Sequence, residues 1–178
     1  MLKRYEEFLK WFDKKLEKYF EEQCEFVQCR LGCCTCCEVG DYPFSRLEAE
    51  YLMAGFIKLP NETKSLIREE IKRLKQINPK MYKCPFLIDG KCSVYQYRGI
   101  VCRVHGLAWF DEDVNKIRLP YCVNKGLNYS KVFDRESGEV FLQNPISENL
   151  RIDSILRSEK ARQYELECGE IRSLIKWF

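Results

Sequence analysis

The sequence predicts a small, mainly α-helical protein with short β-hairpins and irregular loops, built as a single domain around a cysteine-rich metal site. Three observations lead to this prediction: apolar residues recur at helical spacing at both ends of the chain, tight-turn sequences interrupt its middle, and five of the nine residues from Cys29 to Cys37 are cysteines. One domain is the usual outcome for 178 residues, a length that can bury a core without crosslinks. The expected parts are an N-terminal helix at 2–22, a metal-binding core at about 29–122 and C-terminal helices at about 147–178.

The composition is that of a folded protein with a solvated surface, because 46% of residues are hydrophobic and 32% are charged, with both signs mixed. The net charge of +3 is too small to predict nucleic acid or anionic lipid as a partner. The N-terminal residues carry charges throughout and contain no apolar run long enough for a signal peptide or a membrane span. We therefore expect a cytoplasmic protein that binds neither nucleic acid nor membranes, with a redox or protein partner of unknown identity and an oligomeric state that the sequence does not reveal.

The N-terminal helix is predicted from a stripe of apolar residues spaced by three and four positions: Leu2, Tyr5, Leu9, Phe12, Leu16 and Tyr19. We expect this stripe to pack on the domain core. A coiled-coil seam toward a partner is the alternative, although about three heptads are the minimum for that interpretation. Cys24, one turn beyond Phe20, is expected to be a small buried residue and not a ligand.

Two helices are predicted between the cysteine-rich segments. Ser45 and Glu48 have the spacing of a capping box, which predicts a helix over about Arg46 to Phe56. A second helix is expected to begin after Pro60, with Asn61 as its cap, and to end at about Ile77.

Short hairpins are predicted in the middle of the chain. The Asp89-Gly90 dipeptide is typical of a tight turn, so the residues from Cys84 to Cys92 are expected to form a small hairpin. Residues 116–119 are expected to be extended, and 132–142 to form another hairpin around Ser137 and Gly138.

Helical spacing returns over 147–178, where Ile152, Ile155 and Leu156 are followed by further apolar residues up to Phe178. Cys168 belongs to this apolar pattern, so we expect it to pack in the core instead of binding a metal.

The cysteine spacings predict a metal site. Cys29 and Cys33 are separated by three residues, and Cys33 and Cys36 by two, which are loop spacings that let two thiolates reach one ion or cluster. Eleven cysteines in a cytoplasmic protein are expected to be reduced or metal-bound, and a disulfide framework is the weakest alternative. The eight candidate ligands are Cys29, Cys33, Cys36, Cys37, Cys84, Cys92, Cys102 and Cys122.

These segments resemble the CxxCxxCC cysteine-cluster family, the YkgJ-like zinc- or iron-chelating domain. The residues that match its pattern are Cys33, Cys36, Cys37, Cys84, Pro85, Phe86, Leu87, Cys92, Tyr95, Arg98, Cys102 and Arg103. The resemblance implies a metal site between about Cys29 and Cys122, with Arg98 and Arg103 as the cations next to the cofactor. Relatives in that family include iron–sulfur oxidoreductases and flagellin lysine N-methylases, so an activity of either kind is an open expectation.

The chain departs from the family pattern at two positions. Cys29 stands four residues before Cys33 where the family has three, which leaves Cys34 as an alternative ligand. Gly99 stands where the family has a proline after Arg98.

Soft thiolate ligands select zinc or iron–sulfur chemistry over magnesium, calcium or manganese. Eight cysteines are two complete four-cysteine shells, or one cluster shell with additional thiols. We expect an iron–sulfur cluster, of the 4Fe-4S type, with zinc as the alternative; His105, three residues after Cys102, is a possible zinc ligand or a hydrogen-bonding neighbour of the site.

The function expected from these features is that of an iron–sulfur protein with a redox or cluster-dependent transfer role. The alternative is a structural zinc module used for interaction or metal handling. A radical S-adenosylmethionine enzyme is disfavoured, although Cys29, Cys33 and Cys36 have its spacing, because the chain is short and Thr35 replaces the usual aromatic residue. With a single histidine, a Ser-His-Asp site is also disfavoured, so catalysis would depend on the metal.

Overall fold

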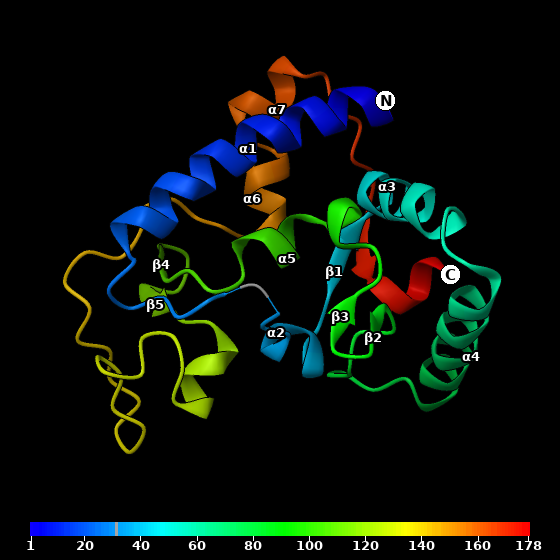
Figure 1. Cartoon of the computed structure of the whole chain (residues 1–178). Helices are drawn as coiled ribbons and strands as arrows, with labels where there is room; N and C mark the ends of the chain where they lie inside the picture. The colour runs from blue at the N-terminus through cyan, green and yellow to red at the C-terminus, as the bar shows by residue number, and fades with distance from the viewer. Residues whose placement is uncertain (31) are drawn as a thin grey trace.

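The structure is a computed structural model that describes residues 1–30 and 32–178 (Figure 1). Helices make up about 46% of the chain and the strands form short antiparallel pairs, as the sequence predicts. The helices are α1 (Leu2–Glu22), α2 (Thr35–Glu38), α3 (Arg46–Ile57), α4 (Asn61–Ile77), α5 (Ile100–Val104), α6 (Ile152–Leu156) and α7 (Glu159–Gln163), with 3-10 turns η1 (Tyr95–Tyr97), η2 (Tyr121–Lys125) and η3 (Leu174–Trp177). The strands are β1 (Pro43–Ser45), β2 (Leu87–Ile88), β3 (Lys91–Cys92), β4 (Trp109–Asp111), β5 (Lys116–Arg118) and β6 (Ile171–Ser173).

Helix α1 has the predicted bounds, and its apolar stripe packs inward. Tyr5, Phe8, Leu9 and Phe12 are all at most 2% exposed and share one core cluster with residues of α3, α6 and α7. Figure 1 shows α1 crossing the molecule with α6 and α7 beside it. Because this face is buried within the chain, it is not a seam for a partner. Among the described residues, no helix combines the length and the apolar character that crossing a membrane requires.

Cys24 corrects one expectation, because it is exposed and not buried. Helix α1 ends at Glu22, and the chain then turns through hydrogen bonds from Cys24 N to Glu21 O and from Val27 N to Gln23 O. Cys24 therefore lies outside the helical stripe that would have turned it inward.

Helix α3 begins with the predicted capping box. The Ser45 hydroxyl accepts a hydrogen bond from Glu48 N at 3.2 Å, and the Glu48 carboxylate accepts one from Ser45 N at 2.9 Å. The other carboxylate oxygen of Glu48 accepts from Ile100 N at 2.8 Å. This buried carboxylate therefore caps α3 and also fixes the start of α5, which carries Cys102.

Helix α4 has the predicted length, but its cap differs. Pro60 occupies the N-cap position, so Asn61 is the first helical residue and makes no capping hydrogen bond. The helix ends at Asn78, whose left-handed backbone (φ 47°) stops it, as the Asn-Pro sequence predicts. Ile67, Ile71 and Leu74 pack into a second apolar cluster.

The hairpin around Asp89 and Gly90 is confirmed. Strands β2 and β3 pair antiparallel, and both turn residues have positive φ (48° and 72°), which is the two-residue turn that suits a twisted hairpin. The expected extended segment at 116–119 is β5, which pairs with β4. The hairpin expected at 132–142 is present only as an isolated bridge between Phe133 and Val140.

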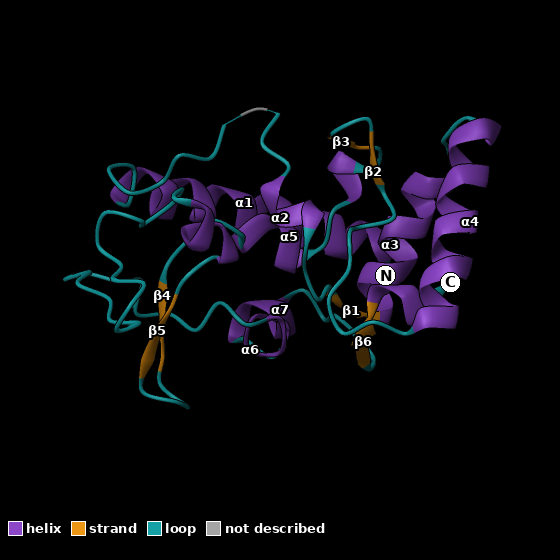
Figure 2. Cartoon of the chain, turned by 90° about the horizontal axis from the view of Figure 1, so that it is seen from below, coloured by secondary structure: helices purple, strands orange, loops and turns teal. Residues whose placement is uncertain are grey.

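The C-terminal segment is less helical than predicted. The α-helices over 147–178 are α6 and α7, with five residues each; β6 then pairs antiparallel with β1, and the 3-10 turn η3 follows it. The apolar spacing was misleading because Ile155 and Leu156 pack in the first core cluster, whereas Leu174 and Ile175 pack in the second. The β1–β6 pairing joins segments far apart in sequence, which is consistent with the expected single domain. Figure 2 shows these two strands side by side.

Candidate metal centre

The candidate ligands come from segments that meet around α2. Cys36 and Cys37 lie on α2, Cys84 precedes the β2–β3 hairpin, and Cys92 ends that hairpin. A hydrogen bond from Cys84 N to Cys37 O at 2.8 Å joins the two cysteine-rich segments directly. Figure 1 shows α2 near the middle of the view, with α5 and the hairpin close to it.

Five cysteines form what we call the hairpin group: Cys36, Cys37, Cys84, Cys92 and Cys102. Three of them, Cys84, Cys92 and Cys102, pack against the second apolar cluster, which contains Phe86 and Val94. Burial raises the pKa of the Cys102 thiol well above its ordinary value, and charge on Cys84, Cys92 or Cys36 would raise it further. These thiols therefore lie within electrostatic reach of one another in a region of low polarity.

Nearby backbone N–H groups favour the charged form of two of these thiols. Burial raises the pKa of Cys84 to about 12, while the N–H groups of Phe86 and Leu87 oppose that shift by stabilising the thiolate. Burial also raises the pKa of Cys92, and the N–H of Val94 opposes it in the same way. Such donors offset the negative charge of a thiolate that binds a metal.

The neighbouring sulfurs of Cys36 and Cys37 are 3.9 Å apart, so one thiol can donate a hydrogen bond to the other. The hydrogen bond from Cys37 lowers the pKa of Cys36 to about 7, and the same interaction raises the pKa of Cys37. The Arg98 guanidinium also lowers the pKa of Cys36. Cys36 is therefore the member of the pair that can lose its proton near neutral pH.

The remaining three candidates form what we call the loop group: Cys29, Cys33 and Cys122. Burial raises the pKa of Cys122 to about 11, and charge on Cys29 or Cys33 adds to this shift. Helix α2 contacts η2, which carries Cys122, and charge on Cys36 also raises the pKa of Cys29. The loop group therefore lies next to the hairpin group, with Cys36 between them.

Asn128 holds the loop group in place. Its side-chain amide donates to Cys29 Sγ at 3.2 Å and to Gly106 O at 2.9 Å, and its carbonyl oxygen accepts from Gln28 N at 2.8 Å. The side chain is only 2% exposed. Asn128 was missed in the sequence, because 99 residues separate it from Cys29 and nothing local marks it as a neighbour.

The two arginines of the family pattern have different surroundings. Arg98 lowers the pKa values of Cys36 and Cys92, and its guanidinium lies 3.8 Å from the centre of the Tyr95 ring. Arg103 donates instead to Asp13 on α1 at 2.6 Å and to Arg98 O at 3.0 Å. In this arrangement Arg98 acts on the thiols, while Arg103 ties α5 to α1.

The other candidates lie outside both groups. Cys34 Sγ contacts Glu38 Oε1 at 3.8 Å, and Cys168 packs against the first core cluster. The His105 side chain lines a cavity, and its Nε2 is buried without a hydrogen-bond partner among the described residues. Cys168 therefore has the packing role expected of it.

Gly99 is explained by close packing. A β-carbon at this position would lie 2.8 Å from Glu48 Oε1 and 2.8 Å from the Phe44 ring. Any larger residue, proline included, would collide with the same atoms, so this packing explains why a glycine stands here.

The residues fit a thiolate-bound cofactor in their chemistry, since buried thiols converge and N–H donors and a guanidinium stabilise their charged forms. They do not fit a single ion as they stand: within residues 1–30 and 32–178, no three His, Cys, Asp or Glu side chains are arranged to hold one metal ion.

No protein-family model, curated protein or solved structure matches this chain. The resemblance to the CxxCxxCC family therefore stays a prediction from the quoted motif.

Proposed function

We propose that this chain is an iron–sulfur protein with a redox or cluster-dependent transfer role, and that the hairpin group supplies the ligands of its cluster. The observation that carries this proposal is the convergence of Cys36, Cys37, Cys84, Cys92 and Cys102 from α2, the hairpin and α5 beside one apolar cluster. A cytoplasmic protein has little structural use for five such thiols unless they bind a metal.

The number of thiols is what favours a cluster over a single zinc ion. A structural zinc ion is complete with four ligands. The hairpin group alone has five cysteines, and the loop group adds three more.

The residues around the hairpin group stabilise charged thiols and exclude water. The N–H groups of Phe86, Leu87 and Val94 and the guanidinium of Arg98 stabilise negative charge on the sulfurs. Phe86 and Val94, both at most 3% exposed, exclude water on the inner side. When bound, an iron–sulfur cluster would supply one-electron chemistry, whose potential depends on these hydrogen bonds and on solvent access.

A structural zinc module is the second candidate, because the eight candidate cysteines can be divided into two sets of four. Eight cysteines form two sets of four if Cys36 is counted with the loop group, and two zinc ions would use all of them. Zinc would require the side chains to close around each ion.

The deciding experiment is metal analysis of protein purified without oxygen. We expect a brown protein that contains iron and acid-labile sulfide and that gives an electron paramagnetic resonance signal after dithionite reduction. Colourless protein with stoichiometric zinc and no sulfide would remove the redox proposal and leave the zinc module.

A further inference from the structure

A cavity of about 650 Å³ lies between the end of α5, the segment that follows β5 and the start of α6. Its volume is in the range of about 300–1,000 Å³ that small-molecule sites have. Apolar side chains such as Trp109, Leu107 and Leu150 form much of its wall. The cavity borders both cysteine-bearing regions, since His105 follows Cys102 by three residues and Tyr121 precedes Cys122.

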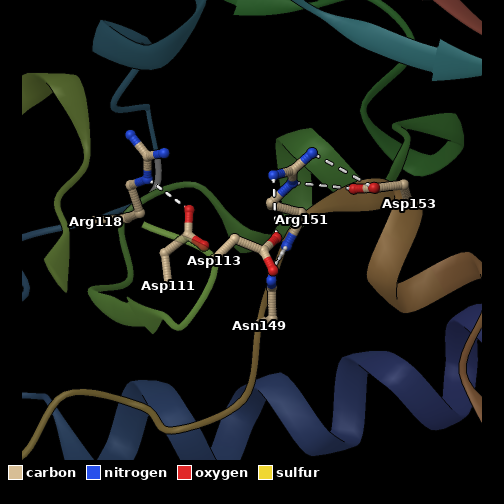
Figure 3. Close-up of polar contacts among 6 residues, drawn as sticks. All are labelled: Asp111, Asp113, Arg118, Asn149, Arg151 and Asp153. Carbon is tan, nitrogen blue, oxygen red and sulfur yellow. Dashed lines mark hydrogen bonds and ion pairs between the residues drawn. The ribbon is translucent and has the colours of Figure 1, made fainter. Parts of the chain in front are cut away.

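Arg118 presents hydrogen-bond donors at this cavity. Its Nε donates to Asp111 Oδ2 at 2.8 Å, and Asp111 is fully buried. Figure 3 shows both terminal nitrogens of Arg118 pointing away from Asp111. The Asp111 carboxylate therefore holds the guanidinium through Nε, and the terminal N–H groups of Arg118 remain available for a ligand.

Arg151 and Arg157 also line the cavity. Arg151 is engaged, because it donates to Asp153 at 3.1 Å and lies 3.5 Å from Asp113 (Figure 3). Arg157 has no side-chain ion-pair partner among the described residues. Arg118 and Arg157 are therefore the cations with capacity for a ligand.

The arginine side chains at this cavity need a ligand that accepts hydrogen bonds. A guanidinium can only donate hydrogen bonds, and a carboxylate or a similar anion matches its fork of N–H groups. Of the acids nearby, Asp153 and Asp113 are turned to Arg151. Asp111 does not line the cavity; its Oδ2 accepts from Arg118, and its Oδ1 is buried with no partner among the described residues.

His105 also lines the cavity and does not oppose an anion there. Burial lowers the pKa of His105, so the imidazole is neutral at pH 7 and adds no charge. Its Nε2 is buried and has no partner within the described part of the chain, so this atom is not counted among the groups that would bind the ligand.

We propose that this cavity binds a small organic acid, with its anionic group on Arg118 and Arg157 and its apolar body against Trp109 and the aliphatic wall. This site uses no cysteine and does not depend on which metal the protein holds.

The test compares two probes of nearly the same shape, 1-naphthoate and the neutral 1-naphthamide, by calorimetric titration of the purified full chain. We expect saturable binding of one naphthoate per chain and binding of naphthamide that is weaker by about tenfold or more, because only the carboxylate pairs with the guanidinium groups. Equal affinities, or no saturable binding of naphthoate, would overturn the proposal.

Variants locate the binding site. Arg118→Gln and Arg157→Gln should each weaken naphthoate binding by about tenfold and leave naphthamide unchanged. Arg162→Gln on α7 removes the same charge from an exposed residue that does not line the cavity and should have no effect. Unchanged naphthoate affinity in both cavity variants, or an equal loss in Arg162→Gln, would contradict this site. Metal and sulfide content are measured on the same samples, purified without oxygen: if they hold no iron and no sulfide but still bind naphthoate, the proposed function fails and this inference stands.

Discussion

The hairpin group and the loop group hold their cysteines by different means. In the hairpin group, backbone N–H groups two or three residues further along oppose the rise in the pKa of Cys84 and Cys92, and both side chains pack against an apolar cluster. In the loop group, Cys29 and Cys33 are exposed, and Cys29 is held by the side chain of the distant Asn128. Cys84 and Cys92 are therefore supported locally by the hairpin, whereas Cys29 depends on one tertiary contact.

This difference implies that the two groups are not equally easy to disrupt by mutation. A thiol that is supported by its own turn and by a buried core is positioned as soon as the core forms. A thiol that depends on a side chain 99 residues away is positioned only when both loops dock. We therefore expect the hairpin group to dominate metal content and stability, and the loop group to be the more easily perturbed.

The largest effect is expected for Cys102→Ser. The Cys102 thiol is surrounded by other thiols and by apolar residues, so the substitution removes a proposed ligand and places a hydroxyl where burial is costly. We expect loss of the bound metal and a free energy of unfolding lower by at least about 2 kcal/mol. Metal analysis and denaturant titration check both effects, with the exposed Cys24→Ser as the control that should change neither. Equal metal loss in the two variants would refute the division between ligands and other cysteines.

The pair Cys37→Ser and Cys34→Ser tests which thiol belongs to the hairpin group. Cys37 contacts Cys36, and charge on Cys84 or Cys102 raises the pKa of Cys37. Cys34 contacts Glu38 instead. We expect Cys37→Ser to lose metal and Cys34→Ser to retain it, as measured by iron and zinc content per chain. Metal loss in Cys34→Ser but not in Cys37→Ser would mean that Cys34, and not Cys37, is the ligand in this loop.

Gly106→Ala probes the loop group without removing a thiol. Gly106 has φ 107°, and a β-carbon there would lie 2.7 Å from Cys29 Sγ. Gly138→Ala is the matched control, since Gly138 also has positive φ (74°) but has no atom within 4 Å of the β-carbon position. We expect the control to cost about 1 kcal/mol of backbone strain and Gly106→Ala about 2–3 kcal/mol, because it adds a collision. Thermal unfolding of both variants gives the difference, and equal costs would mean that Cys29 moves aside freely.

The smallest effect is expected for Asn128→Ala. This change leaves the buried Gly106 O without its partner, which costs about 1 kcal/mol. Gln28 is exposed, so water replaces the partner of its N–H, and Cys29 is released. We expect faster alkylation of Cys29 by iodoacetamide with the hairpin-group metal retained. Asn124→Ala, which removes only an exposed bond to Tyr121 O, is the control. Loss of all metal in Asn128→Ala would show that the two groups are not separable.

Local sequence determined much of this protein. The bounds of α1, the capping box of α3 and the Asp89-Gly90 hairpin follow from residues that are neighbours along the chain. The same holds for the identity of the thiols, because an unusual density of cysteines needs no tertiary information to be recognised.

Only the tertiary structure decided which cluster each C-terminal apolar residue joins, why Gly99 is required, and that Arg103 pairs with Asp13 while Arg98 faces the thiols. It also brought Asn128 to Cys29. Helical periodicity and turn chemistry depend on interactions within a few residues, so they can be predicted from sequence. Contacts between distant segments depend on how the whole chain packs, and no local pattern encodes them.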